Sequence, residues 1–155
     1  GRFAVSTDRV THFAVGAGDA GEEAIAHYGF TRDGIESLVN RTRYWQDAPE
    51  IENIQGGTYE KFDRTEKAYH LIGDEGNKLT FNIQASESRP VVNPCLVIKG
   101  SPGGKPTVKV NGKNPKESMD LRIGEEQNEK GQFQTIVWFR MEKTEPLQIS
   151  LEWQD

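Results

Sequence analysis

The chain has 155 residues, 34% of them hydrophobic and 28% charged, with a formal net charge of −5. This length predicts one domain with a core of its own, and no window of about 18 apolar residues is present to span a membrane. The 24 acidic against 19 basic residues argue against nucleic acid or an anionic membrane surface as the main partner. Cys95 is the single cysteine, which excludes an intrachain disulfide and a cysteine zinc cage.

Residues 1–57 are predicted to mix short strands with a helix. Residues 3–5 and 10–15 have the composition of short strands, and residues 22–30 that of a poor short helix. Gly16, Gly18 and Gly21 have the GxGxxG spacing, but no alternation of strands and helices follows, so a loop is favoured over a dinucleotide site. The chain begins without Met and without a signal-peptide pattern, so we expect a module from a longer protein.

Residues 31–45 predict the one clear helix. Thr31 or Asp33 is expected to cap its start, and Pro49 indicates that it has ended by Ala48. Side chains at three- and four-residue steps form its buried stripe, and they are Ile35, Leu38, Thr42 and Trp45, with Val39 beside them.

After residue 57, period-two alternation and turn residues predict about eight strands. Residues 67–72 and 77–85 are expected to form a hairpin with its turn at residues 73–76, and residues 133–140 and 147–153 a second hairpin. Residues 91–98 contain Pro94, which predicts an edge or bent strand.

The alternation also predicts which side chains face inward. Four residues of the last strand are expected in the core: Leu147, Ile149, Leu151 and Trp153. In the preceding strand Phe133, Thr135, Val137 and Phe139 share one face, and Ile136 and Trp138 the other. We therefore expect a mainly β fold, an antiparallel β-sandwich or jelly roll with one α-helix near the N-terminus. Residues 1–155 would form a single module, with 58–155 as the sandwich core.

Aromatic and basic side chains are the candidate ligand-binding residues. Trp138 faces away from the predicted core, and an exposed indole can stack on a sugar ring; the alternative is a second layer that covers it. Tyr44 and Trp45 at the helix exit have the same two readings, with the core favoured for Trp45 because it lies on the apolar stripe, and Arg41 lies on the polar face of the helix. Arg matches a carboxylate with a two-pronged fork of donors.

Catalytic and metal-binding patterns are weaker. His12, His27 and His70 have no metal-binding spacing, and no GxSxG elbow is present. His27 or Tyr28 beside an arginine such as Arg43 has the residue types to abstract a proton next to a uronate carboxylate. Asp74, Glu75 and Asn77 have oxygens that calcium could use, although a solvated turn is favoured because three such side chains are too few.

The runs VVNPCLVIKG, TVKVNGK, DLRIG and TIVWFRMEKTEPLQISL resemble the β-sandwich portions of large secreted polysaccharide-active enzymes, lyases among them. The resemblance covers roughly residues 58–153 and carries over no catalytic residue. It implies an extracellular or periplasmic setting and an ancillary module, non-catalytic by itself, that binds glycan or supports a catalytic domain. Two alternatives stay open: part of a lyase or hydrolase whose site another chain or domain completes, and a structural or assembly subunit that uses Trp138 and the strand at residues 91–98 as an interface.

Overall fold

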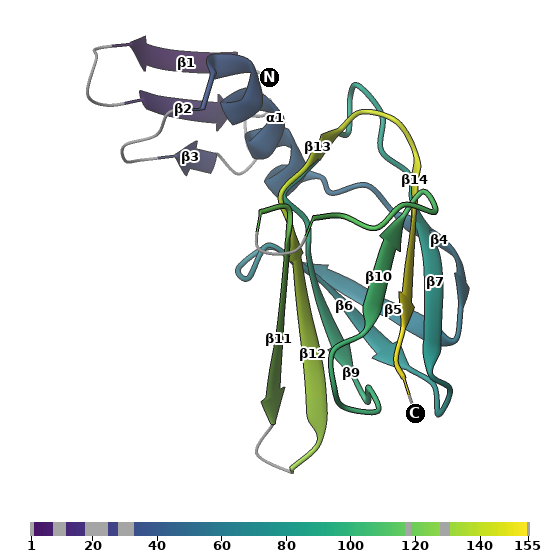
Figure 1. The fold of residues 1–155 in the computed structure, drawn as a ribbon. Coiled ribbons are helices and arrows are strands. Elements are labelled where there is room, and N and C mark those ends of the chain that lie inside the picture. Colours follow the sequence, from purple (N-terminus) through teal and green to yellow (C-terminus); the bar gives the residue numbers. More distant parts are fainter. Residues whose placement is uncertain are drawn as a thin grey trace.

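The structure is a computed structural model that describes residues 2–7, 12–17, 25–27, 33–116, 119–127 and 131–154, with the segments before residue 33 described as backbone. Within these ranges the protein is mainly β with one helix, as the sequence predicts (Figure 1). The elements in chain order are β1 (Arg2–Thr7), β2 (His12–Ala17), β3 (Ile25–His27), α1 (Ile35–Gln46), β4 (Ile51–Gln55), β5 (Gly57–Asp63), β6 (Ala68–Gly73), β7 (Lys78–Ile83), β8 (Val91–Val92), β9 (Cys95–Lys99), β10 (Thr107–Val110), β11 (Leu121–Gln127), β12 (Phe133–Phe139), β13 (Glu142–Lys143) and β14 (Leu147–Glu152).

Two larger sheets hold most of the strands. One has five strands in the order β11-β12-β9-β6-β5, and the other has four in the order β10-β14-β7-β4. Their strands pair antiparallel except for β6 and β9, which run parallel. The two sheets face each other (Figure 1), and buried side chains from both form one hydrophobic cluster, including Tyr69, Leu71, Phe81, Leu96, Val137 and Ile149.

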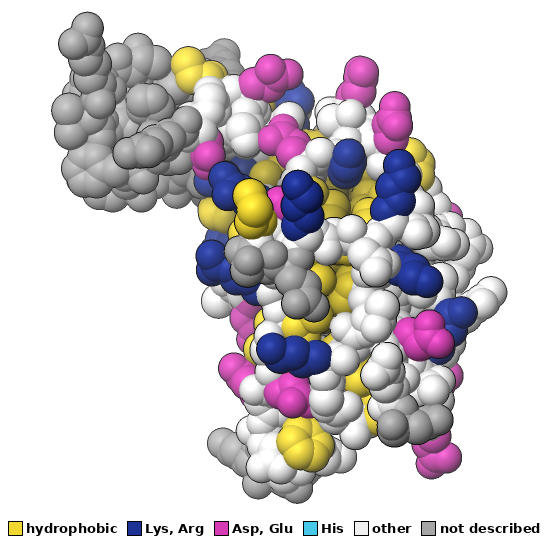
Figure 2. All heavy atoms as spheres, in the orientation of Figure 1, with side chains coloured by type: hydrophobic (Ala, Val, Ile, Leu, Met, Phe, Trp, Pro, Cys, Tyr) yellow, Lys and Arg dark blue, Asp and Glu magenta, His cyan; other side chains and the backbone are white. Residues whose placement is uncertain are grey.

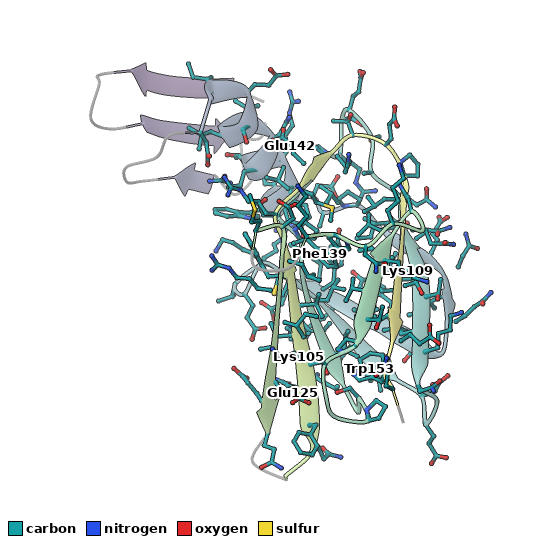
Figure 3. The ribbon with its side chains drawn as sticks, in the orientation of Figure 1. Lys105, Lys109, Glu125, Phe139, Glu142 and Trp153 are labelled. Carbon is teal, nitrogen blue, oxygen red and sulfur yellow. The ribbon has the colours of Figure 1, made fainter. Side chains whose placement is uncertain are left out.

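The inward faces follow the predicted alternation. Leu147, Ile149, Leu151 and Trp153 are all buried, with at most 3% of their surface exposed. Thr135, Val137 and Phe139 are fully buried, and Phe139 lies between the sheets (Figure 3). Phe133 is 43% exposed, because it is at the far end of β12, beyond the core.

Both predicted hairpins are wrong. The β6 and β7 strands are consecutive in the chain but belong to different sheets, and so do β12 and β14. The turn after β6 and the connection after β12 each carry the chain across the core to the facing sheet. Period-two alternation determines which side chains point inward, but it is the same for a strand beside its partner and for a strand across the core.

The segment around Pro94 is bent as predicted, and of its two strands β8 has a single partner whereas β9 is not an edge. Asn93 has a positive φ of 49°, which separates the two-residue strand β8 from β9. The β8 strand pairs with β13, whereas β9 is hydrogen-bonded between β12 and β6. Pro94 lacks an N–H donor but precedes β9, so the pairing of β9 is complete on both sides.

The helix is shorter at its start than predicted. Gly34 is the N-cap residue and makes no side-chain cap bond, so neither Thr31 nor Asp33 has that role. Asp33 instead accepts a hydrogen bond from Arg41 at 2.5 Å. The helix ends at Gln46, in agreement with the position of Pro49.

The helix buries side chains on two sides. Leu38 and Thr42 are buried as the stripe predicts, but Ile35 is 45% exposed, and Asn40 and Tyr44 are buried instead. The reason is that α1 packs against β2 and β3 and also against β8. The predicted stripe describes a helix that is buried on one face only.

The first strands form a three-stranded antiparallel sheet in the order β1-β2-β3, which lies beside α1 (Figure 1). Residues 25–27 are a strand where a poor helix was predicted. Gly16 lies in β2 and not in a loop, whereas Gly18 and Gly21 lie outside the described residues. The β4 strand pairs with β7, so residues 51–55 belong to the four-stranded sheet. The division of the module at residue 57 stays a prediction.

In the part of the chain that the structure describes, no helix has the length and apolarity required to cross a membrane.

Candidate ligand-binding site

A pocket of about 400 Å³ lies where the helix meets the outer face of the five-stranded sheet. Its walls come from four parts of the chain: Arg41 and Trp45 on α1, Glu66 and Lys67 before β6, Val92, Asn93 and Cys95 around the bend from β8 to β9, and Trp138 on β12. A volume of several hundred cubic ångströms is typical of pockets that take small ligands. The pocket unites three residues that the sequence suggested separately: Arg41, Trp45 and Trp138.

Trp138 faces outward because its neighbours Val137 and Phe139 fill the core. In the sheet it is directly opposite Arg122 on β11 and Cys95 on β9. Cys95 is in turn opposite Ala68 on β6. Strand register therefore sets a row of side chains across the outer face, and Trp138 is the large apolar member of that row.

The turn between β5 and β6 presents Glu66 and Lys67 to the pocket. Asp63 organises this turn, since its Oδ1 accepts hydrogen bonds from the backbone N–H groups of Thr65 at 2.9 Å and Glu66 at 3.2 Å. Its Oδ2 accepts a hydrogen bond from Nζ of Lys61 at 2.8 Å. The Lys61 ammonium, together with the two N–H groups, lowers the pKa of Asp63 to about 2.

Lys67 ends the turn in the left-handed region, with φ of 57°. A non-glycine residue rarely adopts this conformation unless the surrounding structure imposes it. Asn93, on another wall of the pocket, also has a positive φ. Its Oδ1 accepts a hydrogen bond from the backbone N–H of Met141 at 3.1 Å, and its own N–H donates to the Met141 carbonyl at 2.8 Å. Two walls of the pocket are thus built on unusual backbone.

Both indole rings of the pocket contact a cation of the chain itself. The Nζ atom of Lys67 lies 4.6 Å from the ring centroid of Trp45. The Cζ atom of Arg122 lies 5.3 Å from the ring centroid of Trp138. Both distances fall in the range of cation–π attraction. The two tryptophans are half-buried, so each keeps surface for a ligand.

The remaining charged groups of the pocket have partners. The Nε2–H of His70 donates to Oε2 of Glu66 at 2.7 Å, and Arg41 donates to Asp33 at 2.5 Å. The Arg41 side chain is 20% exposed, so part of its guanidinium surface stays accessible from the pocket. Arg41, Lys67 and Arg122 therefore put three positive charges in and beside a pocket whose own carboxylate, Glu66, already accepts a hydrogen bond.

Cys95 is the one free thiol of the chain, and it is half-buried in the pocket wall. Burial raises the pKa of this thiol, and the negative charge of Glu66 raises it further. The thiol is therefore mainly protonated at neutral pH and a weak nucleophile. The reactivity of Cys95 can therefore be used to detect a ligand in the pocket.

Tyr44 lies in the core rather than in the pocket. Its side chain is fully buried, and its ring packs edge-on against Phe62 with centroids 5.4 Å apart and beside Tyr69 at 6.2 Å. Burial, more than the neighbouring tyrosines, raises the pKa of Tyr44 well above its usual value. Of the two aromatic residues at the helix exit, only Trp45 is available to a ligand.

The candidate catalytic residues are not brought together in the described part of the chain. Arg43 is exposed on α1 and is not part of the pocket wall. His27 is the last residue of β3 and is described as backbone, and Tyr28 lies outside the described residues. Their role in proton abstraction stays a prediction.

Asp74, Glu75 and Asn77 are exposed in the turn that crosses from β6 to β7. The backbone of this turn has structural partners: Asp74 N–H donates to the Gly56 carbonyl, and the Asn77 carbonyl accepts from Trp153 N–H. Across the described ranges, no group of three or more His, Cys, Asp or Glu side chains is placed to hold a metal ion. Calcium binding at this turn gains no support from the geometry.

Sequence reasoning missed several members of the pocket. Glu66, Lys67 and Asn93 come from turns whose three-dimensional position depends on strand order. Cys95 and Arg122 could have been found from the register of Trp138, had the neighbours of β12 been known.

The chain was also compared with protein-family models, curated proteins and solved structures, and none of them matches.

Proposed function

We propose that this chain is a β-sandwich module that binds carbohydrate in the pocket between Trp45 and Trp138, and that it is not catalytic by itself. The two facing sheets, which share one core, support a sandwich as the architecture. The module would be ancillary to a carbohydrate-active protein, in keeping with the resemblance noted in the sequence.

The observation that carries the proposal is the meeting of two tryptophans, 93 positions apart, in one pocket of about 400 Å³. Indole faces pack against the C–H surface of a sugar ring and exclude water from it. Arg41, Asn93 and Glu66 surround the rings with polar groups that can bind hydroxyl groups. A pocket that combines apolar rings with a few polar groups is the usual design for an oriented small ligand.

The competing assembly hypothesis loses most of one of its two supports. It required residues 91–98 to be an open edge, but β9 is paired on both sides and only the two-residue strand β8 has a single partner. Trp138 lines the pocket, which favours a compact ligand over a protein interface.

The test is binding of neutral and acidic oligosaccharides, measured by calorimetry and by tryptophan fluorescence. The chain has three tryptophans, and Trp153 is 3% exposed in the core, so Trp153→Phe leaves fluorescence from the two pocket residues alone. We expect Trp138→Ala and Trp45→Ala each to weaken binding about tenfold or more, and Trp153→Phe to keep it.

Binding that survives in both Trp138→Ala and Trp45→Ala would overturn the pocket assignment. Measurable turnover of any polysaccharide by this chain alone would overturn the non-catalytic part of the proposal and favour the lyase or hydrolase alternative.

A further inference from the structure

We infer that the pocket selects acidic sugars, with Arg41 and Lys67 as the groups that recognise the carboxylate of a uronate residue. This inference rests on the proposed function and names the class of its ligand.

The charge around the pocket is opposite in sign to that of the chain. The chain has a net charge of −5, yet the pocket and its rim carry the cations Arg41, Lys67 and Arg122. Glu66 is the one acidic residue of the pocket wall, and its carboxylate accepts a hydrogen bond from His70. A local positive field on an acidic protein attracts anionic ligands to that place.

Aromatic rings can also attract cations, so a cationic ligand is the main competitor. Here one face of each ring is already in contact with a cation: Lys67 lies over Trp45, and Arg122 lies over Trp138. A second cation in the pocket would meet these positive charges and would have to displace them. An anion would be attracted by the same positive charges of Lys67 and Arg122 and would not have to displace them.

The two recognising groups suit a planar carboxylate. Arg41 offers a fork of N–H donors, of which Nη2 is engaged with Asp33. Lys67 offers a compact ammonium held against Trp45, so its position is set before the ligand arrives. A sugar stacked on the indole would therefore place a ring carboxylate within reach of a cation that is already oriented.

Figure 2 shows how charge is arranged on the face of the molecule seen in Figure 1. Lys and Arg side chains are spread over this face around a central strip of hydrophobic side chains, and Asp and Glu lie mainly towards its outline. This face offers a set of surface cations away from the pocket, and Lys109 on β10 is one of them (Figure 3). General attraction of a polyanion to such surface charge must be separated from recognition in the pocket.

The experiment compares one acidic oligosaccharide, a short oligogalacturonate, with the same oligosaccharide after reduction of its carboxyl groups. Calorimetry with the wild-type chain should show the acidic form binding about tenfold or more tightly than the reduced form. A sulfated neutral oligosaccharide forms a third arm, which separates a carboxylate preference from a preference for any anion.

Two substitutions test the named cations. Lys67→Gly removes the ammonium at a position whose positive φ suits glycine, and Arg41→Lys keeps a charge beside Asp33 but removes the fork. Each should reduce the preference for the acidic form severalfold. Lys109→Gln, which removes an exposed charge on the outer face of the four-stranded sheet, should leave it unchanged.

The outcomes separate the two proposals. Equal affinity for the acidic and reduced forms, both lost in Trp138→Ala, would overturn the inference and leave carbohydrate binding intact. A preference reduced as much by Lys109→Gln as by Lys67→Gly would show attraction to surface charge and would also overturn the inference, as would equal or tighter binding of the sulfated arm. Absence of binding in all three arms would overturn the proposed function itself.

Discussion

Asn40 on α1 donates a hydrogen bond from Nδ2 to Oε1 of Glu142 on β13 at 2.6 Å, across 102 positions of the chain. The other carboxylate oxygen of Glu142 accepts a hydrogen bond from Ser37 at 2.8 Å. One carboxylate thus fastens two turns of the helix to a strand, at the place where Figure 3 shows Glu142 beside α1. Because Arg41 and Trp45 come from the same helix, this fastening sets the position of one wall of the pocket.

Glu142→Ala should therefore affect both stability and ligand binding. Loss of the two hydrogen bonds should lower the free energy of unfolding by about 1 kcal/mol, and the freed helix should weaken oligosaccharide binding severalfold. Urea unfolding and calorimetry measure the two effects. Glu145→Ala, three residues further along the same connection and exposed, is the matched control. An unchanged affinity in Glu142→Ala would show that the helix keeps its place without this contact.

Trp153 is a buried residue whose indole N–H has no hydrogen-bond partner among the described residues. An unpaired buried donor costs stability, whereas the ring itself contributes through its burial. We expect Trp153→Phe to leave the free energy of unfolding within about 1 kcal/mol of wild type or to raise it, and Trp153→Ala to lower it by about 3–5 kcal/mol. A large loss in Trp153→Phe, measured by urea unfolding, would indicate that the N–H does have a partner in solution.

Asp63 should make the protein sensitive to strong acid. The pKa of its carboxyl is lowered from 3.8 to about 2 in the folded state, chiefly by Lys61. The stabilisation is fully present above the unfolded-state value of 3.8 and is lost as pH falls towards 2. Unfolding measured from pH 5 to pH 2 should show a smaller loss of stability in Asp63→Asn than in wild type. Equal acid profiles would show that Asp63 has no stabilising role.

Cys95 should react slowly with iodoacetamide and report on the pocket. Burial and then Glu66 raise the pKa of the thiol, so alkylation should accelerate with pH beyond the range of an ordinary cysteine. Glu66→Gln should shift this rise to lower pH, because it removes the nearby negative charge. A saturating oligosaccharide should slow alkylation of the wild-type chain, since Cys95 lines the pocket. An alkylation rate that does not change with the ligand would place the ligand elsewhere.

The sequence predicts the side-chain pattern of this fold better than its connections. Ile149 and its alternating neighbours are buried as predicted, and Trp138 faces out, because the pleat of a strand determines these directions locally. The partner of each strand depends on contacts distant in sequence. For this reason β12 and β14 were predicted to pair, although β9 and β11 are the partners of β12.

The candidate site shows the same division. Trp138 and Arg41 could be chosen from their residue types and their place on a strand or helix, whereas Trp45 was chosen from its residue type although its place on the apolar stripe favoured the core. Tyr44 was chosen with them because the helix was expected to have one buried face, whereas it packs on two sides. Lys67 and Asn93 could not be predicted, since strand order decides where the turns that carry them lie.

The strand order also has a consequence for how the protein is made. The β10 strand has a single partner in its sheet, β14, and β14 also pairs with β7. During synthesis, β7 and β10 therefore leave the ribosome well before the strand that joins them. Until β14 emerges, the edges of β7 and β10 that pair with it stay open, and Phe81 and Val108 lack their cross-strand neighbours Ile149 and Leu151. The nascent chain therefore exposes unpaired strand edges until β14 has been made.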